Sequence, residues 1–221
     1  VIIAQGEFAK IALDIHVRLV NVAGVTTGGI RVNTAVRGVA FELNGPAPFH
    51  AVIGLHAVRH VDFRVGREPM AYIIGSKEFW SLNFKTTPDV LIPRPATETL
   101  VETLLLLSDE TSMGQSLKLL DMGTGSGVIA VIAAREIVGC QVTATDVAPE
   151  ILAVARTNAE KHGVSNKIDF LRCDMFAGIP KTFYDFIVSN PPYIKTADLK
   201  GLMPDVRDFE PQCALDGGAD G

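Results

Sequence analysis

Residues 117–127 have the sequence LKLLDMGTGSG, and this stretch decides the fold that we expect. The apolar residues at 117–122 predict a buried β-strand. The glycines that follow predict a tight turn, because glycine adopts positive φ angles and lets a ligand approach the backbone. An apolar run at 128–137 then predicts a helix. A strand, a glycine-rich turn and a helix in this order are typical of a ligand-binding α/β sheet.

Strands and helices alternate further along the chain. The apolar runs at 141–145, 168–172 and 183–188 predict more strands, and residues 149–162 predict a helix. This alternation is typical of a parallel, Rossmann-like sheet with helical crossovers. A sheet that ended at 183–188 would leave a long apolar edge exposed. We therefore expect a native C-terminal portion, with the remaining strands, to be missing from this sequence.

The part of the chain before this sheet is less regular. Apolar residues at helical spacing predict a helix near 6–22, and alternating aromatic residues at 78–84 predict a β-hairpin. The prolines of residues 92–95, with the sequence IPRP, predict a stiff connector because each proline restricts itself and the residue before it. A leucine-rich helix at 97–107 and a polar linker at 108–116 are expected to follow.

Composition places the chain among globular proteins of a reducing compartment. Apolar residues make up 48% and charged residues 20% of the sequence, and no run approaches the roughly 20 apolar residues that span a bilayer. The three cysteines are scattered, so neither a disulfide framework nor a CxxC metal site is indicated. We expect no membrane association and a cytoplasmic location, with mitochondria as the alternative.

Charge and histidine spacing bear on the class of ligand. The net charge is −5, and the acidic excess falls in residues 67–221, which argues against a broad binding surface for duplex nucleic acid. His56 and His60 have a spacing that can ligate a metal on one helix face. No carboxylate motif accompanies these histidines, so we predict packing or surface roles for them and no metal site.

Acidic residues follow successive predicted strands, at the edge of the sheet where such folds bind ligands. Asp121 precedes the glycines and suits a ligand with a positive amino group. Asp146 is placed to accept both hydroxyls of a ribose, and Asp174 is placed to meet an adenine amino group. An amino acid, a ribose and an adenine together outline S-adenosyl-L-methionine. The candidate cofactor residues are Asp121, Gly123, Thr124, Gly125, Ser126, Gly127, Asp146 and Asp174.

The segment Ser189-Asn190-Pro191-Pro192-Tyr193 forms a rigid elbow after the last predicted strand. Two successive prolines end strand pairing because they offer no backbone N–H. The Asn190 side-chain oxygen and the Pro191 carbonyl can each accept one N–H of an NH₂ group, and Tyr193 can stack on a planar group. Positioning of the nitrogen in line with a methyl donor would then carry the catalysis. The candidate catalytic residues are Asn190, Pro191, Pro192 and Tyr193.

Several motifs together resemble the HemK family of protein-(glutamine-N5) methyltransferases, which act on peptide chain release factors. These motifs are DMGTGSG at 121–127, NPPYI at 190–194, IPRP at 92–95 and FEPQCALDGG at 209–218. The resemblance implies a class I S-adenosylmethionine-dependent methyltransferase fold behind a small helical N-terminal domain. We accordingly expect a substrate-docking domain at 1–75, a β-hairpin and proline-rich linker at 76–95, and an incomplete methyltransferase domain at 96–221.

The same resemblance implies the site contacts and the partner. The cofactor would contact the turn at 123–127, Asp146, the Asp174–Met175 pair and Asn190, and would leave as S-adenosyl-L-homocysteine. Residues 190–193 would hold the glutamine of the Gly-Gly-Gln loop of a release factor, so the partner is a protein and no direct nucleic-acid binding is expected. The alternatives are a nucleic-acid amino-methyltransferase of the adenine-N6 type and an inactive binding module with the same fold.

Overall fold

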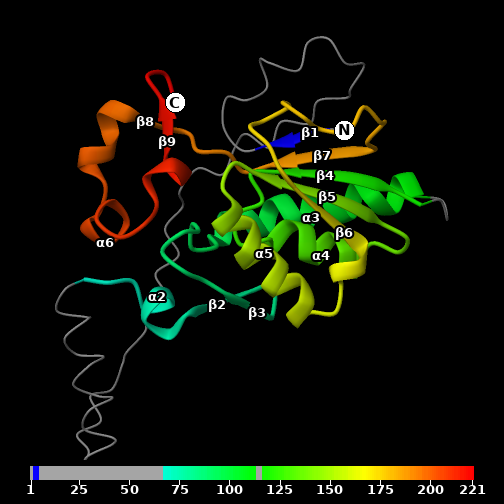
Figure 1. Ribbon diagram of the computed structural model, residues 1–221, viewed down its shortest axis with the longest axis horizontal. Helices are drawn as coiled ribbons and strands as arrows, with labels where there is room; N and C mark the ends of the chain where they lie inside the picture. The colour runs from blue at the N-terminus through cyan, green and yellow to red at the C-terminus, as the bar shows by residue number, and fades with distance from the viewer. Residues whose placement is uncertain (1, 5–66, 113–115) are drawn as a thin grey trace, which may run out of the picture.

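The structure is a computed structural model that describes residues 2–4, 67–112 and 116–221 (Figure 1). The predicted helix near 6–22, His56 and His60 lie outside the described residues, as does most of the expected docking domain at 1–75.

The described core is a parallel sheet of five strands, which confirms the predicted α/β class (Figure 1). Across the sheet the strands follow the order β1-β7-β4-β5-β6, and every neighbouring pair is parallel. The strands are β1 (Ile2–Ala4), β4 (Lys118–Met122), β5 (Gln141–Asp146), β6 (Ile168–Arg172) and β7 (Phe186–Ser189). The strand that ends in the glycine-rich turn, β4, is therefore central, and the strand that ends in the elbow, β7, is its direct neighbour.

Strand β7 is not the edge of the described sheet, so the exposed apolar edge from which we inferred missing strands is already covered. Strand β1 pairs with it in parallel, with Ile2 opposite Ile187 and Ala4 opposite Ser189. A three-residue strand has no periodicity of its own, so pairing between such distant segments leaves no local signal in the sequence. Strand β7 also begins later than predicted, since Phe183 is 96% exposed and the ladder starts at Phe186.

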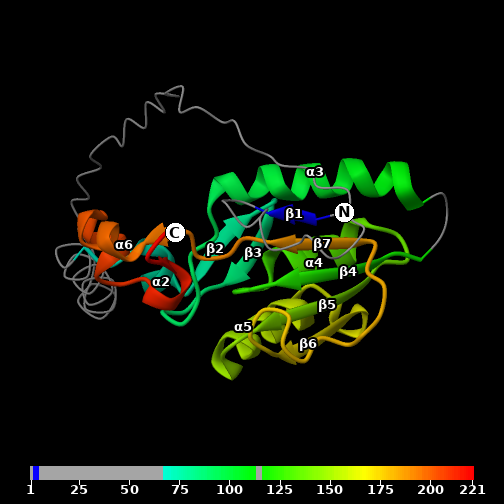
Figure 2. The same cartoon turned by 90° about the horizontal axis from the view of Figure 1, so that it is seen from above.

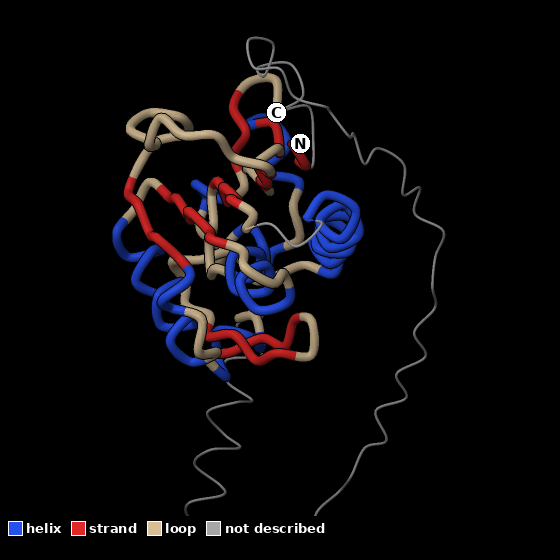
Figure 3. Tube along the Cα trace, turned by 90° about the vertical axis from the view of Figure 1, so that its right-hand side faces the viewer, coloured by secondary structure: helices blue, strands red, loops and turns tan. Residues whose placement is uncertain are grey.

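Three long helices cover one face of the sheet, and a loop covers the other (Figure 3). The helices are α3 (Pro95–Ser112), α4 (Val128–Glu136) and α5 (Pro149–Lys161). They enclose the main hydrophobic core with alternate strand residues such as Leu119, while Leu120 points to the opposite face and packs with the loop at 175–184. This alternation follows from the two-residue period of a strand.

Helix α3 is longer than predicted and includes residues that we expected in a polar linker. Ser108 lies inside the helix, where its hydroxyl donates a 2.8 Å hydrogen bond to the Leu105 carbonyl oxygen. This bond satisfies the serine without ending the helix. Leu100 and Leu104 of the same helix are buried in the core, and helix α3 continues to Ser112.

The predicted β-hairpin is confirmed, and it packs on the core of the sheet domain (Figure 2). It consists of β2 (Ser76–Phe79) and β3 (Leu82–Lys85), and the short helix α2 (Met70–Ile74) precedes it. Phe79 and Phe84 are fully buried and make an edge-to-face contact with ring centroids 6.3 Å apart. The hairpin is therefore held in place by buried aromatic surface as well as by its strand ladder.

The chain after the elbow folds back on it through short elements that the sequence did not predict. Strand β8 (Ile194–Lys195) continues from the elbow and pairs in parallel with β9 (Asp216–Gly218). Short helices lie between these two strands: η3 (Thr196–Gly201), α6 (Pro204–Arg207) and η4 (Gln212–Ala214). Elsewhere in the chain, the short helix η2 (Ser165–Lys167) precedes β6. Within the described part of the chain, no helix has the length and apolar character to cross a membrane.

Candidate functional site

A cavity of about 300 Å³ lies at the carboxyl ends of the parallel strands, lined by residues of β4, β5 and β7 and by the residues that follow β6. This is the sheet edge where the sequence predicted the site. Most of the predicted site residues line the cavity: Gly123, Thr124, Gly125, Ser126, Asp146, Asp174, Met175, Asn190, Pro191 and Pro192. Asp121, Gly127 and Tyr193 do not line it.

Asp121 lies behind the glycine-rich turn and organises its backbone. One carboxylate oxygen accepts hydrogen bonds from the Thr124 hydroxyl at 2.6 Å and from the Ala130 backbone N–H at 3.2 Å. The other oxygen is buried and has no partner among the described residues. Burial raises the pKa of Asp121 to about 7, while the bonds from Thr124 and Ala130 act in the opposite direction. The carboxylate thus supports the turn from inside the domain.

Gly127 and Tyr193 are the other two predicted site residues that do not line the cavity. Gly127 precedes α4 with a φ of 82°, and a Cβ atom there would lie 3.1 Å from the Cβ of Ala155 on α5. The glycine therefore permits the close approach of α5 to the turn. Tyr193 is 54% exposed and lies outside the cavity lining.

Asp146 joins the glycine-rich turn to the end of β5. One carboxylate oxygen accepts a 3.0 Å bond from the Gly125 backbone N–H, and the other accepts a 2.8 Å bond from the Val147 backbone N–H. Burial raises the pKa of Asp146, and these backbone bonds partly offset the effect. Each oxygen keeps a further lone pair, so the carboxylate can still accept hydrogen bonds from a ligand that has hydroxyl groups.

The predicted Asp174–Met175 pair lies in a turn directly after β6. Asp174 is exposed and forms an isolated bridge with Ala177. Met175 has a φ of 49°, a left-handed conformation that costs energy for a side chain with a Cβ atom. The strained backbone holds the Met175 side chain beside the cavity, where it can pack on an apolar or aromatic ligand group.

The elbow presents one unpaired hydrogen-bond acceptor. The Asn190 amide nitrogen donates a 3.4 Å bond to the Thr97 hydroxyl, and the Asn190 carbonyl oxygen is buried without a partner among the described residues. A buried acceptor without a partner costs about 1–3 kcal/mol. Because Asn190 lines the cavity, a bound ligand with an N–H or O–H donor can satisfy this oxygen.

Strand β9 supports the elbow from the other side. A Cβ atom at Gly217 would lie 2.8 Å from the Cα of Tyr193 and 3.0 Å from the Pro192 carbonyl oxygen. Only glycine allows so close an approach. Ser189 adds a further constraint, since its hydroxyl donates a 2.9 Å bond to the Met122 carbonyl oxygen on the neighbouring strand. The elbow is therefore fixed on two sides.

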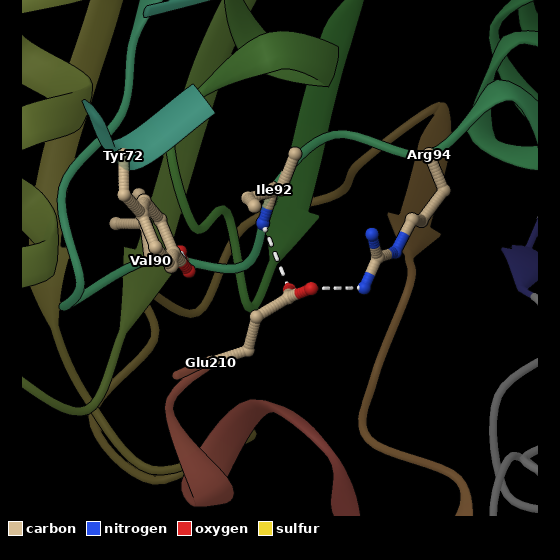
Figure 4. Close-up of polar contacts among 5 residues, drawn as sticks. All are labelled: Tyr72, Val90, Ile92, Arg94 and Glu210. Carbon is tan, nitrogen blue, oxygen red and sulfur yellow. Dashed lines mark hydrogen bonds and ion pairs between the residues drawn. The ribbon is translucent and has the colours of Figure 1, made fainter. Parts of the chain in front are cut away.

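Several lining residues were missed as site residues, although two of the motifs contained them. Arg94 and Thr97 come from the connector and the start of α3, and Cys213 and Ala214 come from the C-terminal segment. Glu210, which the motif at 209–218 includes, is buried behind this wall and contacts both Arg94 and Ile92 (Figure 4). The motifs IPRP and FEPQCALDGG were both recognised in the sequence. Nothing in either motif indicates that the two segments contact each other in the folded protein.

Comparison with known proteins supports a methyltransferase. Residues 94–203 match the family described as Methyltransferase small domain. A release factor glutamine methyltransferase of Geobacter sulfurreducens is 44% identical over 158 residues, which cover 72% of this chain and 53% of that protein. The enzyme of the same name from Moorella thermoacetica is 45% identical over 161 residues, covering 73% and 56%. The chain spans about half the length of these curated relatives.

Among solved structures, an RNA methyltransferase from Salinibacter ruber in complex with S-adenosyl-L-homocysteine is 25% identical to this chain. Its TM-score is 0.37, and the match covers 54% of this chain and 72% of that chain.

The fold and the site define an S-adenosylmethionine-dependent methyltransferase domain. Residues 94–203 match the methyltransferase small domain family, and 72–73% of the chain is similar to release factor glutamine methyltransferases. S-adenosyl-L-methionine is the cofactor of this class, and the residues present fit it. Gly123 and Gly125 leave open space above the backbone, Asp146 can accept hydroxyl groups, and Met175 can pack on a ring.

Proposed function

We propose that the protein transfers a methyl group from S-adenosyl-L-methionine to the side-chain nitrogen of the glutamine in the Gly-Gly-Gln loop of a peptide chain release factor. The observation that carries this proposal is the buried Asn190 carbonyl oxygen, which has no hydrogen-bond partner among the described residues and belongs to a residue of the cavity wall. A glutamine amide supplies the missing N–H. The homology to release factor glutamine methyltransferases supports this choice of substrate.

The elbow performs the reaction by positioning. Asn190 and the Pro191 carbonyl accept the two N–H groups of the substrate amide and fix the direction of the nitrogen lone pair. The cofactor supplies an electrophilic methyl group on a sulfonium. The two acceptors would stabilise the positive charge that develops on the substrate nitrogen as it takes up the methyl group. The nitrogen then loses a proton to water.

The remaining parts of the proposal concern the partner, the location and the domains. The partner is a release factor, a protein, and contact with nucleic acid is not required. The protein works in the cytoplasm. Residues 1–75 dock the substrate, residues 76–95 form the linker, and residues 96–221 carry the methyltransferase fold. The burial of Phe79 and Phe84 in the core supports a rigid attachment of the linker to the methyltransferase fold.

The test is transfer of a labelled methyl group from S-adenosyl-L-methionine. Three acceptors are compared: a release factor, the same release factor with its loop glutamine changed to alanine, and double-stranded DNA. We expect label only in the unmodified release factor. Label in DNA would instead identify a nucleic-acid amino-methyltransferase, and cofactor binding without transfer to any acceptor would identify an inactive binding module.

A further inference from the structure

An ion pair between Glu210 and Arg94 joins two segments of the cavity wall that are 116 residues apart in sequence (Figure 4). One Glu210 carboxylate oxygen accepts a hydrogen bond from the Arg94 guanidinium, and the other accepts a 3.2 Å bond from the Ile92 backbone N–H. The Glu210 side chain is 1% exposed, whereas the Arg94 side chain is 36% exposed. The carboxylate is thus fixed inside the protein, while Arg94 is partly exposed and lines the cavity.

The Arg94 side chain keeps unused hydrogen-bond donors. A guanidinium has five N–H groups, and within the described part of the chain only one contact, with Glu210, uses them. Arg94 lines the cavity, so the remaining donors are available to a bound molecule. Because the ion pair with Glu210 already restricts the Arg94 side chain, binding of a ligand to Arg94 costs less side-chain entropy.

The connector links the backbone of Arg94 to the elbow. The Arg94 carbonyl oxygen accepts a 2.9 Å bond from the Thr97 backbone N–H, and the Thr97 hydroxyl accepts the bond from the Asn190 amide. Arg94 is thereby linked through one residue to the group that would hold the substrate nitrogen. The predicted cofactor acids belong to other parts of the cavity wall, Asp146 at the end of β5 and Asp174 in the turn after β6.

We propose that Arg94 is a substrate-binding residue that donates hydrogen bonds to a backbone carbonyl of the peptide segment that carries the methylated side chain. Glu210 is a positioning residue that holds Arg94 for this contact. The inference rests on the proposed function for the identity of the peptide. A neutral carbonyl is favoured over a carboxylate because the adjacent buried Glu210 neutralises Arg94 and would repel a second anion.

The test measures binding, so it does not depend on turnover. The dissociation constant of a release-factor protein is measured by calorimetry with the complete protein in the presence of S-adenosyl-L-homocysteine. We expect Arg94→Met to weaken binding at least tenfold, as removal of a hydrogen bond from a charged group does, and to leave the affinity for S-adenosyl-L-homocysteine within about twofold. Arg94→Lys should restore part of the loss, and Glu210→Gln should weaken release-factor binding in the same direction.

The double variant separates positioning from a purely structural role. If Glu210 acts through Arg94, Glu210→Gln adds nothing to the binding defect of Arg94→Met. Arg135→Met and Glu136→Gln on α4 are matched controls, because they remove an exposed ion pair that does not line the cavity. We expect no change in either affinity for the controls.

Specific outcomes would overturn the inference. Release-factor binding by Arg94→Met at the wild-type level would exclude the proposed contact, even if the wild type methylates glutamine as proposed. A loss of affinity for S-adenosyl-L-homocysteine in Arg94→Met would assign Arg94 to the cofactor instead. If the wild type binds the release factor without methylating it, the proposed function is contradicted. The comparison of Arg94→Met with the wild type would still test the proposed Arg94 contact. No binding by the wild type would overturn both.

Discussion

The side chain of Asn158 on helix α5 donates a 2.8 Å hydrogen bond to the Ser126 carbonyl oxygen in the glycine-rich turn. The same amide pairs with Lys85 at the end of the hairpin, accepting a 2.7 Å bond from its backbone N–H and donating a 3.1 Å bond to its carbonyl oxygen. Asn158 is fully buried. One amide therefore fixes the turn, the hairpin and α5 relative to one another.

We expect Asn158→Leu to lower the free energy of unfolding by about 3 kcal/mol, because it removes the partner of the buried Ser126 carbonyl oxygen and of two partly buried backbone groups of Lys85. The affinity for S-adenosyl-L-homocysteine should fall as well, since the turn loses its support. Chemical denaturation and calorimetry measure the two effects. Asn166→Leu is the control at an exposed position and should change stability by less than about 0.5 kcal/mol. Equal effects of the two substitutions would contradict this role for Asn158.

Gly217→Ala should slow methyl transfer without weakening cofactor binding. The new Cβ atom would lie 2.8 Å from the Tyr193 Cα, so the backbone of the elbow must move. A displacement of this kind at a positioning site lowers kcat by roughly tenfold to a hundredfold. Steady-state kinetics with a release factor measure the change. Gly201→Ala, where a Cβ atom meets nothing within 4 Å, should have wild-type activity; a wild-type kcat for Gly217→Ala would contradict the prediction.

The burial of Asp121 predicts a pH-dependent stability. Its pKa is raised to about 7 in the folded protein, so between about pH 4 and pH 7 the folded state holds a proton that the unfolded state has lost. The free energy of unfolding therefore falls as pH rises through this range. Asp121→Asn cannot ionise at this position, so it should lack this contribution to the pH dependence. We expect the stability of Asp121→Asn relative to wild type to rise by about 1.4 kcal/mol per pH unit between pH 5 and 7. Denaturation at several pH values measures this slope, and a constant difference would contradict it.

Met175 is expected to matter more for ligand contact than for stability. Met175→Gly relieves a left-handed backbone conformation, but it also removes packing against Leu120 and Met122 and adds unfolded-state entropy, so we expect the free energy of unfolding to change by less than about 2 kcal/mol. The same substitution removes a cavity-lining side chain and should weaken S-adenosyl-L-homocysteine binding several-fold. Ser81→Gly, at a φ of 56° in the hairpin turn, is the matched control, because it should gain stability with unchanged binding. Unchanged S-adenosyl-L-homocysteine binding by Met175→Gly would contradict the proposed ligand contact.

The sequence predicted the features that depend on local pattern. Apolar periodicity located the parallel strands, and the acids at 146 and 174 lie at the strand ends where they were expected. It did not predict that Asp121 turns inward, because the choice between ligand and backbone depends on the three-dimensional path of the turn. The Arg94–Glu210 pair and the addition of β1 to β7 were also missed. Both join segments more than a hundred residues apart, and such contacts leave no local periodicity.

The most direct test of the central claim is Asn190→Ala, with the modified residue identified by tandem mass spectrometry of a release factor incubated with S-adenosyl-L-methionine. The wild type should place one methyl group on the side-chain nitrogen of the loop glutamine. Because the variant lacks the carbonyl oxygen that accepts the substrate N–H, its kcat should fall at least about a hundredfold, while S-adenosyl-L-homocysteine still binds measurably. Methylation of the same glutamine by Asn190→Ala at the wild-type rate would contradict the account.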